Sequence, residues 1–239
     1  MERKEKRLAD YREKLKDCAL IKNMHPDSID SFLSLFHKET WPKNTCILSA
    51  EKLSYHFYII LSGRIKMYQV DDWNGKEITL FLLTKCDIFD LFCLLDGNKH
   101  TVYYECLDKA KVICAPMEDL RKWLDENPEN YKQILPYAGR HLRLLENFVS
   151  DITFADISTR LLNLLLRNVN EESQNLELIN DLPNKEIANL IGSTRAVVNR
   201  HLQELKENGS LKISRKKMEI KDLKTLIRIM ADKKKYNPY

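Results

Sequence analysis

Residues 183–207 read PNKEIANLIGSTRAVVNRHLQELKE, and this stretch decides the fold of the C-terminal part of the chain. Its apolar residues recur three and four apart, which predicts a first short helix ending at Gly192, where glycine tolerates positive φ. Ser193 or Thr194 would cap a second helix that buries Val198 and Leu202. The pattern predicts a helix-turn-helix, whose second helix enters the major groove of DNA. The alternative is an ordinary helical hairpin with a charged outer face.

The polar side chains of this region are the candidate DNA contacts. Arginine suits guanine O6/N7 and asparagine suits adenine N6/N7, so the second helix supplies the base-reading candidates Thr194, Arg195, Asn199 and Arg200. The strand-like runs 211–213 and 218–220 enclose a basic tip, as in the wing of a winged helix. The candidate phosphate contacts, which would add affinity without reading sequence, are Lys185, Ser193, Gln203, Arg215, Lys216 and Lys217.

The charge of the chain is concentrated in this region. Residues 157–239 hold 16 Lys/Arg and 10 Asp/Glu, whereas the rest of the chain holds 23 and 25. A basic C-terminal part on a nearly neutral chain is what a DNA-binding domain requires. The sequence therefore predicts double-stranded DNA as a partner.

The middle of the chain has a different pattern. From about residue 41 to 116, short β-branched and aromatic runs alternate with turns, and Asn74-Gly75 is a strong hairpin signal. This pattern predicts a small β-barrel or jelly roll, preceded by a helix over residues 3–21 that packs on it. The predicted strands are Tyr55–Leu61, Ile65–Val70, Glu77–Leu83, Thr101–Leu107 and Lys111–Ala115.

A long helix is predicted from about residue 128 to 154. Its apolar residues are spaced 3, 4, 3, 4, 3, which is a heptad seam. The seam consists of Leu135, Ala138, Leu142, Leu145, Val149 and Ile152. Either the seam pairs with a second copy, or the helix packs on its own domain. Because two-fold DNA readers need a dimer to place two recognition helices, the dimer is favoured.

Composition sets the outer limits. The chain has 239 residues, begins MERKEKRLAD and contains no run of about 18 apolar residues, so we expect a cytoplasmic protein without a membrane span. Its six cysteines, at 18, 46, 86, 93, 106 and 114, form no CxxC pair. We expect reduced, mostly buried thiols and no metal site.

The order of a β-roll, a long helix and a winged helix-turn-helix resembles the Crp/Fnr family of bacterial transcription regulators. The resemblance extends from about residue 20 to 225 and rests on FYIILSGRIKMY (57–68), NGKEITLFLL (74–83), FDLFCLLDG (89–97) and IGSTRAVVNRHL (191–202). It implies an α+β protein with a sensing β-roll over 1–125, a dimerisation helix and hinge over 126–155, and a winged helix-turn-helix over 156–239. It also implies a homodimeric regulator rather than an enzyme, with RNA polymerase as a partner if the protein is an activator.

The departures from the family pattern concern the signal. Members that bind cyclic AMP use a Gly-Glu pair, an Arg-Ser pair and a Thr-Ser pair, for which this chain has Asp90-Leu91, His100-Thr101 and Leu145-Glu146. Without the arginine, a buried phosphate would lack its partner, so cyclic AMP is not expected and the effector is an unknown small molecule. The candidate pocket residues are Asp90, Leu91, Lys99, His100, Thr101, His141, Leu145 and Glu146.

Other cofactors and other protein classes require residue patterns of their own. The cysteine spacing that an iron–sulfur cluster needs is missing, which makes that cofactor unexpected. Haem remains possible, because the types of ligand that it uses are present, and so does thiol-based redox sensing. A cupin-type enzyme would need a His-x-His motif, which this sequence lacks. A protein-interaction module that binds no DNA is a further alternative.

The recognition helix also departs from the family. The family pattern Ser-Arg-Glu-Thr-Val-Ser/Gly-Arg becomes TRAVVNR over residues 194–200, so both arginines are kept and the glutamate is replaced by Ala196. Glutamate accepts a hydrogen bond from cytosine, whereas alanine contacts a thymine methyl group. We therefore add Ala196 to the base-reading set and expect a half-site unlike the common TGTGA or TTGAT.

Overall fold

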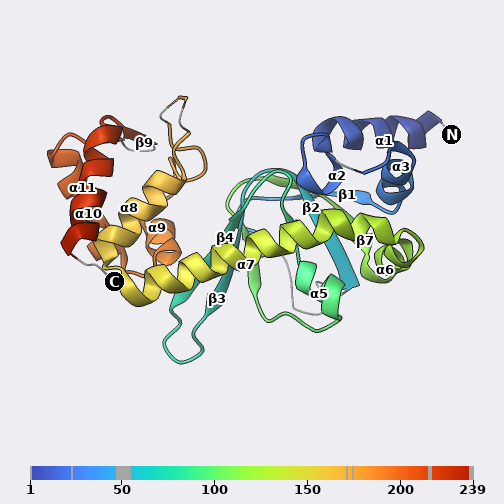
Figure 1. Ribbon diagram of the computed structural model, residues 1–239, viewed down its shortest axis with the longest axis horizontal. Coiled ribbons are helices and arrows are strands. Elements are labelled where there is room, and N and C mark those ends of the chain that lie inside the picture. The colour runs from blue at the N-terminus through green and yellow to red at the C-terminus, as the bar shows by residue number, and fades with distance from the viewer. Residues whose placement is uncertain are drawn as a thin grey trace. The chain divides into compact units, whose positions relative to one another are not determined.

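The computed structural model describes residues 2–22, 24–46, 55–170, 172–173, 175–214 and 217–236. The chain forms two compact units, the first from residues 1–69 and 81–144 and the second from residues 70–80 and 145–239. Figure 1 shows the fold and labels most of its elements. Helices and antiparallel strands are both present, as the predicted α+β class requires. No described helix is long and apolar enough to cross a membrane.

Two antiparallel sheets form the β-roll. The four-stranded sheet has the order β1 (His37–Trp41), β7 (Ala110–Pro116), β2 (His56–Ser62) and β5 (Ile88–Phe89). The three-stranded sheet has the order β4 (Glu77–Leu83), β3 (Ile65–Val70) and β6 (Tyr103–Cys106). The five predicted strands are confirmed to within two residues at each end. Strands β1 and β5 were not predicted, because one is mostly polar and the other has two residues.

Helices cover one face of the four-stranded sheet and close the main core. They are α1 (Glu2–Leu15), α2 (Ala19–Lys22), α3 (Pro26–Ser34), α6 (Met117–Glu126) and the first turns of α7 (Tyr131–Phe154), which follows a short 3-10 turn, η1 (Pro128–Asn130). Tyr11 and Leu15 of α1 and Phe57 and Ile113 of the sheet are each at most 1% exposed. Burial of such aromatic and aliphatic side chains is the main stabilising term of this unit.

The N-terminal helix differs from the prediction. The helix expected over residues 3–21 is interrupted between α1 and α2, and this break lets Leu20 and Ile21 join the core. Cys18, at the break, forms a disulfide with Cys86. The expectation that all six cysteines are reduced is therefore wrong for this pair, whereas Cys46, Cys93, Cys106 and Cys114 are free thiols.

The second unit contains the predicted winged helix-turn-helix. Its elements are α8 (Ile157–Arg167), α9 (Asn184–Leu190), α10 (Arg195–Glu207), β8 (Leu211–Ser214), β9 (Lys217–Ile220) and α11 (Leu223–Tyr236). Gly192 has φ +64°, and a Cβ there would lie 2.8 Å from Ile152 Cδ1, so the turn needs glycine for its conformation and for its close approach. Thr194 caps α10, because its hydroxyl accepts a hydrogen bond from the Val197 amide.

Candidate functional site

The exposed face of α10 carries the predicted base-reading residues. Val198, Leu202 and Leu205 are buried and fix the rotation of the helix. This rotation leaves the opposite face free, and all five predicted base-reading residues are exposed on it: Thr194, Arg195, Ala196, Asn199 and Arg200. This face of α10 is therefore free to contact base edges when the helix enters the major groove of DNA.

The polar groups on this face have weak partners. Arg200 Nε lies 3.9 Å from Glu204 Oε1, and Asn199 Oδ1 accepts a hydrogen bond of 3.1 Å from Asn184. Exposed ion pairs and hydrogen bonds of this kind contribute at most about 1 kcal/mol each. A phosphate or a base edge can therefore displace them at low cost.

A groove of about 560 Å³ runs beside α10 and the β8–β9 hairpin. Three predicted cations line it, namely Lys185, Arg195 and Lys217. Lys185 lies 3.6 Å from Glu77 of the same unit, and Lys217 lies 2.7 Å from Glu219. The groove thus gathers positive charge beside the recognition helix, which is where a phosphate backbone would be held.

The remaining predicted phosphate contacts have different outcomes. Gln203 is exposed on α10. The hydroxyl of Ser193 is buried and has no hydrogen-bond partner among the described residues, so the structure does not present it to a phosphate. Arg215 and Lys216 lie outside the described residues.

Arg160 is a structural residue of this unit that the sequence did not reveal. From α8, its guanidinium donates to the carbonyl oxygens of Ile152 at 2.6 Å, Ala155 at 2.9 Å and Ile191 at 3.4 Å. These bonds satisfy exposed carbonyls at the ends of α7 and α9. Arg160 therefore positions the helix-turn-helix on the end of the long helix. Its role depends on backbone atoms, which no sequence motif records.

The long helix α7 has two apolar faces. Ile134, Tyr137 and His141 are buried in the β-roll. On the predicted seam, Leu135, Leu142 and Val149 are 56%, 54% and 60% exposed. The other seam residues, Ala138, Leu145 and Ile152, are half-buried. The helix therefore both packs on its own domain and presents an unpaired apolar stripe, so the two interpretations of the seam are compatible.

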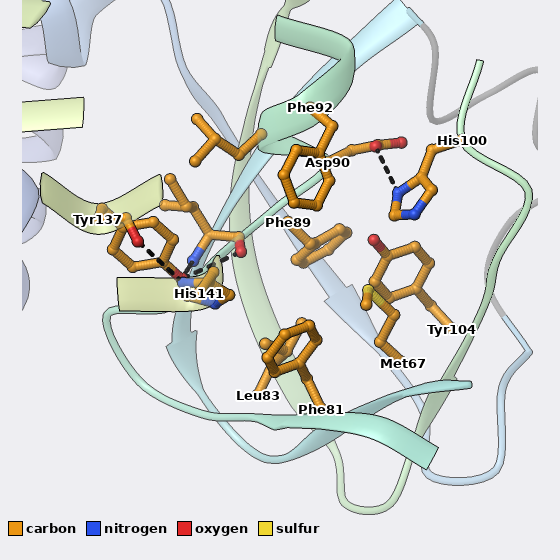
Figure 2. A pocket seen from close by; sticks show the side chains of 12 residues that line it. Met67, Phe81, Leu83, Phe89, Asp90, Phe92, His100, Tyr104, Tyr137 and His141 are labelled. Atoms are coloured by element: carbon orange, nitrogen blue, oxygen red, sulfur yellow. Dashed lines mark hydrogen bonds and ion pairs between the residues drawn. The ribbon is translucent and has the colours of Figure 1, made fainter. Parts of the chain in front are cut away.

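The β-roll contains a small pocket of about 20 Å³ (Figure 2). Of the predicted pocket residues, Asp90, Leu91, His100 and His141 line it. Lys99 and Thr101 are exposed, and neither they nor Leu145 and Glu146 belong to the described lining. The lining residues that the sequence did not reveal are mostly aromatic: Met67, Phe81, Leu83, Ile88, Phe89, Phe92, Tyr104 and Tyr137.

The charge of this pocket differs from what an anionic ligand needs. Figure 2 shows the Asp90 carboxylate beside His100, with 3.3 Å between Oδ1 and Nδ1. The Asp90 side chain is fully buried, and its Oδ2 has no hydrogen-bond partner among the described residues. None of the described lining residues is Lys or Arg. A phosphate entering here would meet a carboxylate without a compensating cation, and its desolvation would not be offset.

The backbone at Asp90 keeps a conformation typical of glycine. Asp90 has φ +64° and ψ 37° and immediately precedes α5 (Leu91–Asp96). Glycine adopts this left-handed conformation without a steric penalty, and Asp tolerates it better than most residues. Asp90 therefore occupies a glycine-like turn while adding a carboxylate to it.

Tyr137 and His141 close one side of the pocket from α7. The Tyr137 hydroxyl accepts a hydrogen bond of 3.0 Å from the Ile88 amide, and its ring stacks on His141 with centroids 4.2 Å apart. Burial lowers the pKa of His141 and raises the pKa of the neighbouring Asp87 carboxyl. Burial therefore disfavours the charged form of His141, which makes it a poor cationic partner for a ligand phosphate.

Comparisons with known proteins agree with this arrangement. Residues 38–127 match the model of the cyclic nucleotide-binding domain, and residues 159–229 match the model of the Crp-like helix-turn-helix domain. Together these domains define a DNA-binding transcription regulator rather than an enzyme. The chain belongs to the Crp/Fnr family.

Individual relatives cover most of the chain. It is 26% identical over 213 residues to the CRP-like cAMP-activated global transcriptional regulator of Mycobacterium tuberculosis, covering 87% of this chain and 95% of that protein. It is 29% identical over 196 residues to the global nitrogen regulator of Nostoc, covering 80% and 87%. A Crp/Fnr-family regulator from Eubacterium rectale has a similar structure, with a TM-score of 0.69 and 22% identity over 89% of this chain and 97% of that one.

Proposed function

We propose that the protein is a homodimeric, sequence-specific transcription regulator whose DNA binding is controlled through the β-roll by a signal other than cyclic AMP. The buried Asp90 carboxylate carries the second part of this proposal, because it occupies a pocket with no Lys or Arg among its described lining residues. This proposal includes a cytoplasmic location and an unidentified small-molecule effector. It also includes contact with RNA polymerase if the protein is an activator.

The DNA part of the proposal rests on α10 and the groove beside it. Arg195 and Arg200 would bind guanine or phosphate, Asn199 adenine, and Ala196 a thymine methyl group. Lys185 and Lys217 would bind the backbone. Two copies related by a two-fold axis would read a palindromic site with half-sites about one helical turn apart.

Selection from a random duplex library, followed by footprinting at several salt concentrations, tests the DNA part. A two-fold footprint whose half-site differs from TGTGA and TTGAT is expected, with an affinity that falls as salt rises. Binding no stronger than that to unrelated duplex, with cell extract present as a source of effector, would contradict specific recognition.

Thermal unfolding with and without cyclic AMP tests the signal. A ligand at about 100 times its Kd stabilises the folded state by about 2.7 kcal/mol and raises the Tm. No shift is expected with millimolar cyclic AMP. A clear shift, or a DNA affinity that rises with cyclic AMP, would contradict this part while leaving the DNA part intact.

A second candidate signal is thiol redox state, because Cys18 and Cys86 form a disulfide. The bond joins the end of α1 to the turn before β5, across 68 residues of sequence. In reducing compartments a disulfide of this kind is usually transient and redox-sensing. Comparing DNA affinity before and after reduction, with Cys18→Ser as the permanently reduced control, tests this candidate. Equal affinities would exclude it.

Haem is tested by the absorbance of the protein as purified. Of the possible axial ligands, His100 and His141 line the pocket. A Soret band that is lost in His141→Ala would establish haem at this site, whereas a spectrum without the band would exclude it as the resident cofactor.

A further inference from the structure

Strand pairing brings together three metal-ligand types that lie far apart in the sequence. In the register of β1 and β7, His37 lies opposite Cys114. Glu39 projects on the same face as His37, because side chains alternate along a strand. Cys114 Sγ lies 3.0 Å from His37 Nε2 and 3.2 Å from Glu39 Oε1, and these last two atoms are 3.3 Å apart. Three donor atoms thus converge on one point at the edge of the four-stranded sheet.

These separations match those of a tetrahedral metal site. With Zn–S of about 2.3 Å and Zn–N or Zn–O of about 2.0–2.1 Å, two ligands of a tetrahedral ion lie about 3.3–3.6 Å apart. The observed triangle is therefore within about 0.6 Å of that geometry on every side before any ion enters. We propose that His37, Glu39 and Cys114 form a Zn²⁺ site, with water as the fourth ligand.

The donor types decide the class of cation. A thiolate and an imidazole favour zinc and its borderline-soft neighbours, whereas Mg²⁺ and Ca²⁺ prefer sites made only of oxygen ligands. When the ion binds, a Zn–S bond replaces the S–H bond of Cys114, and the proton leaves to solvent. Three protein ligands and a water give the open coordination that zinc adopts at sites other than purely structural ones.

The surroundings orient the ligands and leave a path to them. Trp41 Nε1 donates a hydrogen bond of 2.9 Å to Glu39 Oε2, which holds the carboxylate with Oε1 toward the other two donors. Cys114 is completely buried, so its thiol is shielded from bulk solvent. The His37 side chain is 53% exposed, so an ion can reach the site from the His37 side.

The sequence contains no signal for this site. Cys114 is 77 and 75 positions from His37 and Glu39, and its proximity to them depends on the pairing of β1 with β7, which was not predicted. A zinc motif read from spacing alone needs paired ligands close together in the chain. The expectation of no metal site followed from that rule, and the proposal replaces it.

Cobalt substitution and zinc competition test the proposal on the full-length protein with the Cys18–Cys86 disulfide intact. Adding Co²⁺ is expected to give a thiolate-to-cobalt charge-transfer band and the intense visible bands of a tetrahedral ion. Zinc affinity is then measured against a chromophoric chelator. Cys114→Ser and His37→Ala are each expected to weaken zinc binding by more than about 100-fold, and Trp41→Phe by about 10-fold, as for the loss of an outer hydrogen bond.

Matched controls separate this site from other thiols and imidazoles. Cys106→Ser removes another buried thiol, and His56→Ala removes a histidine of the neighbouring strand β2, so both are expected to bind zinc as the wild type does. Because Cys114→Ser alters a buried position, the exposed His37→Ala variant decides the test, with circular dichroism as the check on folding. Absence of the charge-transfer band, or an unchanged zinc affinity in His37→Ala, would overturn the proposal.

Discussion

The pocket of the β-roll and the exposed face of α10 differ in whether their charged side chains are buried or open to solvent. In the pocket, Asp90 is fully buried among aromatic rings, and its Oδ1 lies 3.3 Å from Nδ1 of the His100 imidazole. On α10, Arg195 and Arg200 are exposed, and Arg200 has a carboxylate 3.9 Å away. The pocket restricts which ligands can enter, whereas the α10 face can exchange its partners for those of a polyanion.

The comparison shows where each kind of recognition tolerates change. Loss of one cation from a buried phosphate site removes the ligand, because no water can replace the missing partner. Loss of one polar residue from an exposed DNA face changes which bases are read, while the other contacts hold the backbone. A family member can therefore keep its DNA-binding role while changing its signal.

The largest expected effect comes from the seam of α7 that we propose joins two copies. Leu142 and Val149 are each more than half exposed on this seam, and replacing both with Glu places two charges there. Burying one such side chain contributes about 1.5–3 kcal/mol, so the double variant is expected to dissociate and to lose binding to a two-half-site operator. Light scattering and DNA titration measure this.

The matched control for the seam is Asn147→Glu, which adds a charge at an exposed position of the same helix outside the seam. It is expected to remain dimeric. If the Leu142/Val149 variant also remains dimeric, the seam is not the interface between copies.

The second-largest expected effect concerns the exposed face of α10. Arg200→Ala is expected to weaken binding to the specific site by about 1–3 kcal/mol, or roughly 5–150-fold, while nonspecific binding changes little. Fluorescence anisotropy with specific and scrambled duplexes measures both. Arg228→Ala is the control, because Arg228 is an exposed arginine of α11. Equal losses on the two duplexes would assign Arg200 to phosphate contact rather than to base reading.

A smaller effect is expected at the start of α8. Asp156 caps this helix, because its Oδ1 accepts a hydrogen bond of 2.7 Å from the Thr159 amide, and Lys233 lies 3.0 Å from Oδ2. Partial burial raises the pKa of Asp156, but these hydrogen bonds lower it more, and the net shift is downward from 3.8. Asp156→Ala is expected to cost about 1 kcal/mol at pH 7.

The pH dependence of that effect follows from its sign. A carboxyl whose folded pKa is lowered stabilises the folded state above its unfolded pKa, and the contribution is lost as pH falls through the folded pKa. The difference in unfolding free energy between wild type and Asp156→Ala is therefore expected to shrink below about pH 3.8. Urea unfolding of both proteins from pH 7 to pH 3 measures it, with Asp232→Ala as an exposed control. A constant difference across this range would contradict the capping role.

The smallest expected effect concerns the buried thiols of the β-roll. Burial raises the pKa of Cys93 and of Cys106 to about 12 in each case, with nearby acidic groups adding to it. At pH 8 only roughly one in ten thousand of these thiols is a thiolate, so neither is expected to react with a thiol reagent before unfolding. Cys46 is exposed and is expected to react first, and Cys46→Ser is expected to remove this rapid phase. Rapid reaction in that variant would contradict the shielding.

The sequence predicted what local pattern determines. Hydrophobic periodicity and the glycine at position 192 located the two helices of the motif, and alternating runs located five strands. These features depend on neighbours along the chain, so they are visible without a structure. On α10, the buried side of Val198 and Leu202 also determined which polar residues are exposed.

Features that depend on tertiary contact were not predictable in this way. The aromatic lining of the pocket comes from β4, β5, α5, β6 and α7, and no single segment carries its signal. The Cys18–Cys86 disulfide spans 68 residues, and the hydroxyl of Ser193 is buried in the turn between α9 and α10. Lys99 and Thr101 were placed in the pocket by comparison with a family pattern, but the loop before β6 exposes them.

The two faces of α7 have a thermodynamic consequence. Ile134, Tyr137 and His141 anchor the helix in the β-roll, and the seam on its other side would anchor a second copy. If folding of the β-roll orders the helix, the free energy of association adds to the free energy of folding by mass action. The midpoint of thermal unfolding is then a function of protein concentration, and dilution alone destabilises the sensor domain.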